Sequence, residues 1–254
     1  MKRVLIAAAA MTVAGVCSTQ AADLGARPYY KAAPAAMTTV YDWSGLYLGL
    51  NGGGGSSHNC WHLSAYNTGA PASLPEGCHN ATGGTFGGQI GYRWQAANWV
   101  FGLEGQGNWA NFSGSNSNIS YPGATDRTRI DSFGLITAQV GYAFDNVLLY
   151  VKGGAAAVSN KYDTYRNGPE SFANKTQLGG TVGAGLEVGF AQNWSIGVEY
   201  NHIFMSDKTV GMTYTAPYKS LTGYNGYTNR NSQDVDMALV RLNYKFGGAV
   251  LAKY

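Results

Sequence analysis

Charged residues are scarce in this chain of 254 residues. Asp, Glu, Lys and Arg make up 12% of it, against roughly 25% in an average soluble protein. The formal net charge is +3 and the sequence contains no basic run, so we expect no nucleic acid partner. The seven prolines are too few for a collagen-like or disordered chain.

Long hydrophobic runs are also missing, and the longest one lies in a leader. Met1–Arg3 is positively charged, and the apolar stretch 4–16 that follows is too short to span a bilayer as a helix. Thr19-Gln20-Ala21 supplies a small-x-small cleavage site. The sequence therefore predicts a signal peptide at 1–21, cleaved after Ala21 or Ala22, and an exported protein. An Ala- and Pro-rich periplasmic linker is expected at 22–42.

Glycine and tyrosine, with 36 and 18 residues, are abundant instead. An exported chain of this kind is either a soluble β-protein or a transmembrane β-barrel, whose half-polar strands escape hydropathy analysis. Period-two alternation of apolar and polar residues favours strands. Eight such segments follow the linker, at about 43–54, 84–95, 99–111, 130–144, 147–158, 176–190, 194–206 and 234–246.

The connections between these segments alternate in length. Three have two or three residues, near 96–98, 145–146 and 191–193, and four long polar ones span 55–83, 112–129, 159–175 and 207–233. Short turns at one end and long loops at the other are typical of outer-membrane barrels. We predict an all-β, eight-stranded, antiparallel up-and-down transmembrane β-barrel at 43–246, with a C-terminal tail at 247–254.

Aromatic residues cluster at the expected short-turn end. Such rings are favoured at the level of lipid headgroups and form girdles around membrane barrels. We expect a girdle of Trp43, Tyr92, Trp94, Trp99, Tyr142, Phe144, Phe190, Trp194, Tyr244 and Phe246. A soluble barrel would instead bury these rings and expose the polar face.

The inward faces of the segments carry seven charges. Glu104, Lys152, Glu187, Glu199 and Arg241 lie four or five residues from the short-turn end, and Arg93 and Lys245 lie just below them. An eight-stranded barrel is only wide enough for its own side chains, and unpaired charges there would be costly. We expect one layer of ion pairs that closes the lumen; a water-filled lumen with solvated charges is the alternative.

Cys60 and Cys78 are the two cysteines beyond the leader, and both fall in the first long connection. In an oxidising compartment they are expected to form a disulfide. His58, His62 and His79 flank them, so metal or haem binding is the alternative. An enzyme would need a nucleophile beside a base, and His202 with Ser206 is a poor candidate because the two lie about 13 Å apart along an extended strand. We expect no catalytic residues, metal or cofactor.

Three stretches resemble a known family: ADLGARPYYKA after the leader, YDWSGLYLGLNGGGG at the first strand and VRLNYKFGGAVLAKY at the end. They are similar to the small outer-membrane β-barrel family of alpha-proteobacteria, the Omp25/Omp31-like surface antigens, over essentially the whole mature chain. The resemblance implies an eight-stranded barrel in the bacterial outer membrane with a structural and surface-display role. Because some relatives are porin-like or bind haemin, a narrow channel or a haemin-binding protein is the alternative.

An outer-membrane barrel implies two kinds of partner. Outer-membrane lipid and lipopolysaccharide would surround the apolar face. The last segment alternates and ends in an aromatic residue, Phe246, as do the strands that the outer-membrane assembly machinery reads; the tail that ends in Tyr254 departs from that pattern. No motif in the sequence identifies a surface ligand.

Overall fold

The computed structural model describes residues 41–65, 71–120, 122–166, 169–205, 208–215 and 226–247. All of them belong to one compact unit, Val40–Tyr254. The predicted signal peptide lies outside the described residues, as do most of the predicted linker and tail. Within the described ranges, no helix is long and apolar enough to cross a membrane.

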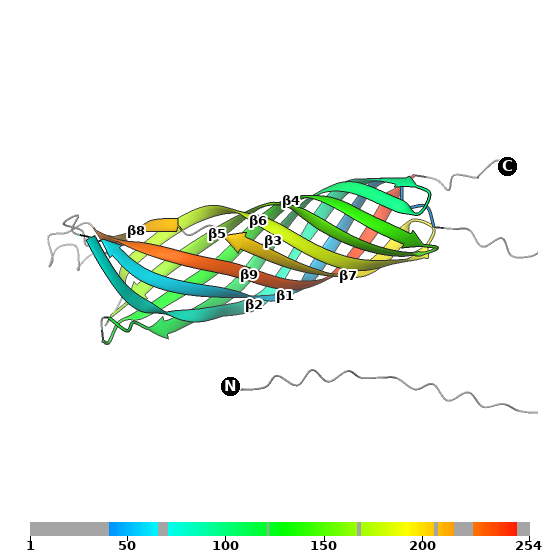
Figure 1. Cartoon of the computed structure of the whole chain (residues 1–254). Coiled ribbons are helices and arrows are strands. Elements are labelled where there is room, and N and C mark those ends of the chain that lie inside the picture. The colour runs from blue at the N-terminus through cyan, green and yellow to red at the C-terminus, as the bar shows by residue number, and fades with distance from the viewer. Residues whose placement is uncertain are drawn as a thin grey trace, which may run out of the picture. The chain divides into compact units, whose positions relative to one another are not determined.

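The fold is a closed antiparallel sheet in which eight positions form a ring (Figure 1). The order runs from β1 to β7 and then to β9, which pairs with β1 and closes the barrel. The short β8 pairs with β9 and with β6. It therefore occupies the same place in the ring as β7, between β6 and β9, nearer the end of the barrel. The strands are β1 Gly45–Ala65, β2 Pro71–Ala96, β3 Trp99–Ser117, β4 Thr125–Phe144, β5 Val147–Tyr165, β6 Pro169–Ala191, β7 Trp194–Met205, β8 Lys208–Tyr214 and β9 Gly226–Phe246.

Side chains alternate between the two faces of the wall, as the period of a strand requires, except at a few register shifts, such as those at Trp109/Phe112 and Ile130/Ser132. Along β7, Ile196 and Val198 are exposed whereas Ser195, Glu199 and Asn201 are buried. Polar residues inside and apolar residues outside are the reverse of a soluble barrel. The pattern fits a barrel whose outer face meets lipid.

The three short connections are two-residue turns. They close the pairs Ala96↔Trp99, Phe144↔Val147 and Ala191↔Trp194. Ala97 and Asp145 adopt positive φ values of 52° and 53°, whereas Asn98 and Asn146 after them do not. A positive φ at the first central residue alone is the pattern of a type II′ turn. These turns define the short-turn end of the barrel.

The four long connections differ from the prediction, because most of each is strand. β1 and β2 stay paired from Gly55↔Gly83 to Ala65↔Pro71, within the range expected as a loop. The polar residues of this stretch still alternate, and Ser57 and Asn59 are fully buried inside the barrel. A polar segment needs no lipid to form a strand when both neighbouring strands offer hydrogen-bond partners. The wall therefore extends well beyond its apolar part, to what we call the long-strand end.

Candidate functional site

The barrel interior holds a network of four charged side chains, all buried. Lys152 Nζ lies 3.0 Å from Glu104 Oε1 and 2.7 Å from Glu199 Oε1. Arg241 also bridges the same two carboxylates, through its two terminal nitrogens. The residues come from β3, β5, β7 and β9, so the network crosses the lumen. Two acids and two bases make it neutral, which is the condition for burying charge at acceptable cost.

Two tyrosines complete this network, and sequence reasoning missed both. Tyr47 Oη donates to Glu104 Oε2 at 2.6 Å, and Tyr150 Oη donates to Glu199 Oε2 at 2.6 Å. Arg241 also donates to the Tyr150 hydroxyl, at 3.1 Å. The alternation along the strand could have predicted that these tyrosines point inward. Tyr150 lies two residues before Lys152 and therefore on the same face of β5.

The other three predicted charges lie in two separate ion pairs. Of the five charges expected in one layer, Glu187 pairs outside the four-residue network, with Arg93 from the level expected below it. Arg93 forms a two-pronged ion pair with Glu187, at 2.8 and 3.1 Å. Lys245 pairs with Asp42, a residue of the predicted linker, at 3.4 Å. The layer splits because strand tilt and side-chain length, as well as distance from the turn, decide which charges meet. Asp42 supplies the fourth acid, which balances the four bases.

Trp43 was expected in the outer girdle, but it lies inside the barrel with only 2% of its surface exposed. It precedes β1 and is therefore free of the strand alternation. Its ring packs on Tyr41, with centroids 4.5 Å apart, and lies under the Arg93 guanidinium at 5.6 Å. The space left beside these rings and the Arg93–Glu187 pair is about 10 Å³, about one water. Tyr41 and Trp43 thus fill the short-turn mouth.

The remaining predicted girdle residues lie on the outside of the wall at the short-turn end. Seven are exposed, and Tyr142 and Tyr244 are half-buried. Neighbouring rings touch, as in Trp99 with Tyr142 and Trp194 with Tyr244, whose centroids are 5.4 and 5.0 Å apart. The full set is Tyr92, Trp94, Trp99, Tyr142, Phe144, Phe190, Trp194, Tyr244 and Phe246.

Above the charges, the lumen contains an apolar layer that sequence reasoning missed. Its members are all buried and point inward: Ala81, Phe112, Ile130, Phe133, Leu135, Ala156, Val158, Ile203, Met205, Val235 and Met237. Several of these residues fall at the edges of segments that were read as loops. The alternation of inward and outward residues continues past those edges, and it could have predicted that the strands extend there. Ser57, Gln177 and Thr181 are buried on the inner face directly opposite members of this layer, which is therefore predominantly apolar.

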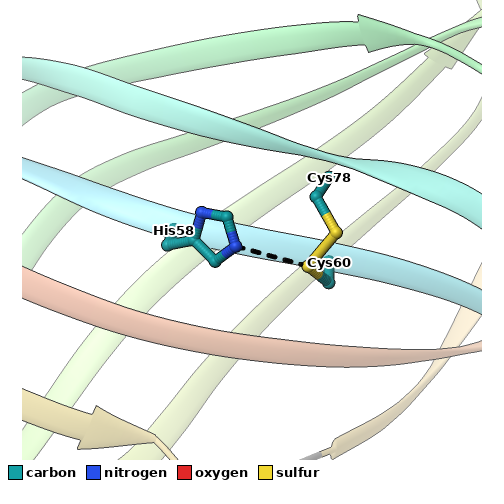
Figure 2. Close-up of side chains that lie close together, drawn as sticks. All are labelled: His58, Cys60 and Cys78. Carbon is teal, nitrogen blue, oxygen red and sulfur yellow. Dashed lines mark hydrogen bonds between the residues drawn. A yellow bond between two sulfur atoms is a disulfide. The ribbon is translucent and has the colours of Figure 1, made fainter. Parts of the chain in front are cut away.

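Cys60 and Cys78 form the predicted disulfide, which joins two directly opposed residues of β1 and β2 rather than two points of a loop. His58 Nε2 lies 3.5 Å from Cys60 Sγ on the outer face (Figure 2). His62 is also exposed, whereas His79 is buried on the inner face, where its Nδ1 pairs with Asn116. Bonded cysteines are poor metal ligands, and the wall separates the histidines. The geometry therefore does not favour the alternative of a joint metal or haem site.

A buried acid lies at the long-strand end, ten residues along β2 from the apolar Phe86. Glu76 accepts a hydrogen bond from Asn229 Nδ2 at 2.6 Å. Burial, together with the nearby carboxylate of Asp126, raises the pKa of Glu76 to about 7. Asp126 accepts from Asn118 and Thr164 at 2.8 and 2.9 Å. Neither acid was predicted as a site residue, because both lie in segments read as loops.

His202 pairs with Asp236, with its Nδ1 2.7 Å from Oδ1, and its ring stacks edge-on against Phe204. Ser206, the candidate nucleophile beside His202, lies outside the described residues.

The inside-out wall, the ring of eight positions and the outer aromatic girdle define a transmembrane β-barrel of the outer-membrane type. Sequence comparison agrees with this class, because the family model described as "Outer membrane protein beta-barrel domain" matches residues 7–246. The chain belongs to this outer-membrane β-barrel family and is an outer-membrane protein.

Relatives among characterised proteins place it more narrowly. The chain is 30% identical over 209 residues to a 31 kDa outer-membrane immunogenic protein of Brucella melitensis, covering 79% of this chain and 85% of that one. It is 32% identical over 162 residues to a 22 kDa outer membrane protein of Rhizobium leguminosarum, covering 63% of each. These matches confirm the resemblance to alpha-proteobacterial surface antigens. The outer membrane protein OprG of Pseudomonas aeruginosa shares the fold, with a TM-score of 0.51 at 12% identity over 81% of this chain and 97% of that one.

Proposed function

We propose that this protein is a non-conducting barrel that anchors in the outer membrane and displays its long-strand end at the cell surface. The observation that carries the proposal is that side chains fill the lumen at three successive levels. Tyr41 and Trp43 fill the short-turn mouth, the ion-paired network crosses the middle, and the apolar layer lies above it. An open pore needs a continuous polar path at all three.

The neutral network is the most restrictive level for ions. Glu104 and Glu199 each accept from both Lys152 and Arg241, so no net charge is left to attract a permeating ion. Opening a path would separate buried partners, which is costly in a medium of low dielectric constant. We therefore expect the wild-type barrel to stay closed without any moving gate.

Surface display follows from the asymmetry of the barrel. The outer face is apolar from the girdle to the level of Phe86 and Trp109, and mostly polar beyond it, with Leu74 and Phe172 as exceptions. Outer-membrane barrels place their short turns in the periplasm, so the extended polar part of the wall would face the outside. The 31 kDa and 25 kDa relatives are named immunogenic proteins, which is consistent with an exposed end.

Single-channel recording in planar bilayers tests the closed lumen. Refolded wild-type protein should give no steady channels, and heat-modifiable mobility on a gel verifies that the barrel is folded. The variant Tyr41→Ala/Trp43→Ala opens only the mouth and should also stay closed. Steady channels from the folded wild-type monomer would refute the proposal and favour the porin-like alternative.

Cysteine labelling on intact cells tests the orientation. Ser73→Cys lies exposed on β2 at the long-strand end, and Gln192→Cys lies exposed in a short turn. The native cysteines are bonded to each other and should not react. A membrane-impermeant maleimide should label Ser73→Cys alone; labelling of Gln192→Cys alone would show the reverse orientation.

A further inference from the structure

The lipid-facing side of the wall carries a row of small residues that crosses four strands. The residues are directly paired from strand to strand, so they form one continuous line around the barrel. A leucine bounds the line at each end. From β1 to β6 the row consists of Leu50, Gly88, Gly107, Gly134, Ala157 and Leu178.

The row is the floor of a groove in the outer surface. The groove has a volume of about 740 Å³, within the roughly 300–1,000 Å³ of ligand-binding pockets. Leu48, Ile90, Ile136 and Leu178 project beside the floor and are all exposed. A Cβ added at Gly107 would meet nothing within 4 Å. The groove is apolar and lies in the lipid-facing part of the wall, so an acyl chain fits its chemistry.

Above the groove, the outer surface becomes aromatic and then cationic. Phe86 and Trp109 are paired in the next outward row, and Trp109 is 73% exposed. Such rings mark the level of the lipid headgroups. Arg129 and Lys161 are paired beyond them, on β4 and β5. Lys161 follows the groove residue Ala157 by four positions, about 13 Å along the strand.

The cationic surface has more positively charged side chains than carboxylates to pair with them. Arg127, Arg129 and Lys161 face two acids: Arg129 pairs with Asp163 at 2.8 Å and Lys161 pairs with Asp131. The cluster therefore carries one excess positive charge. Arg129 Nε has no hydrogen-bond acceptor among the described residues although it is shielded from solvent. The side chains of Arg129 and Lys161 are 39% and 46% exposed, so an anionic group can reach both of them from outside.

We propose that the outer wall of β3, β4 and β5 binds one phosphorylated acyl glycolipid of the outer leaflet. Its acyl chains lie in the groove above Gly107, Gly134 and Ala157, and its phosphate lies at Arg127, Arg129 and Lys161. A second copy of this chain fits less well. A two-fold axis along the membrane normal would bring the cationic cluster against its own copy, and like charges in contact are unfavourable.

Lipid binding by protein refolded without lipid tests the proposal. Native mass spectrometry in detergent should show one lipid A molecule per wild-type barrel. Gly107→Leu fills the groove and should weaken binding at least tenfold. Gly153→Leu makes the same change on the lipid-facing side of β5 outside the groove, where an added Cβ makes only ordinary contacts, and should bind like wild type. Gel mobility verifies that each variant is folded.

The charge variants test the phosphate position. The double variant Arg129→Gln/Lys161→Gln should also bind lipid A at least tenfold more weakly than wild type. Arg230 is an exposed residue of β9, and Arg230→Gln should bind like wild type. Lipid A without its phosphates should bind the wild type as weakly as lipid A binds the double variant. The proposal fails if Gly107→Leu binds lipid A like wild type, or if the dephosphorylated lipid binds equally well. A wild-type dimer that Gly107→Leu dissociates would identify a second copy as the occupant and overturn it.

Discussion

Removing Arg241 should destabilise the barrel strongly, because this residue joins two carboxylates that have no contact with solvent. In the folded protein it bridges Glu104 and Glu199, whose side chains are both fully buried. In Arg241→Ala, Lys152 would remain as the one cation shared by the two acids. Breaking a buried ion pair by removing one partner costs about 3–5 kcal/mol. We expect a loss of that size in the free energy of unfolding.

Urea titration in lipid vesicles, followed by tryptophan fluorescence, measures this loss. Arg230→Ala is the matched control, since it removes an exposed arginine from the same strand and should change stability by no more than about 0.5 kcal/mol. In the double variant Arg241→Leu/Glu199→Leu, a neutral pair leaves together, so the loss should be smaller than the sum of the two single losses. If Arg241→Ala unfolds like Arg230→Ala, the lumen charges are solvated and the network does not close the barrel.

Three further perturbations test other parts of the structure. Because folding raises the pKa of Glu76 from 4.5 to about 7, the folded state holds a proton that the unfolded chain has lost. The free energy of unfolding should therefore fall by about 3 kcal/mol as pH rises from about 4.5 to 7, and Glu76→Gln should remove this fall; equal pH profiles for the two proteins would contradict it. Val182→Lys places a charge on the lipid face and should cost about 2–4 kcal/mol in urea titrations, whereas a cost no larger than that of Val182→Leu would mean that the face is wrongly assigned. Alkylation of protein from cells without reductant should label neither Cys60 nor Cys78, and labelling of both would show that the disulfide does not form in the cell.

The sequence was sufficient to predict the faces of the strands, because the side-chain period of a strand is two and needs no tertiary information. Glu104, Glu199 and Arg241 could be placed inside the barrel for this reason. Their pairing could not be predicted in the same way. Lys152 on β5 reaches across the lumen to β3 and β7, and these contacts depend on the tilt and shear of the closed sheet.

The errors have local causes. The distance of Trp43 from the turns predicts a place in the girdle, but this residue precedes the first strand, so the alternation of a strand does not apply to it. The long segments are predicted as loops because they are rich in Asn, Ser, Gly, Thr and Tyr, although Ser57 and Asn59 continue the inward face of β1. Polar composition indicates the absence of lipid contact; it does not indicate the absence of a strand.

The buried charges also restrict the register of the barrel, and this follows from the nature of its two faces. The outer face meets lipid, which is as apolar as leucine and therefore discriminates little between alternative apolar registers. A slip of one residue in any strand turns its inward residues outward. For β3 or β9 that slip would place Glu104 or Arg241 in the bilayer, at up to about 2–4 kcal/mol per charge near the midplane, and would leave its partners unpaired. The charged side chains inside the barrel therefore also favour one arrangement of the strands over its neighbours.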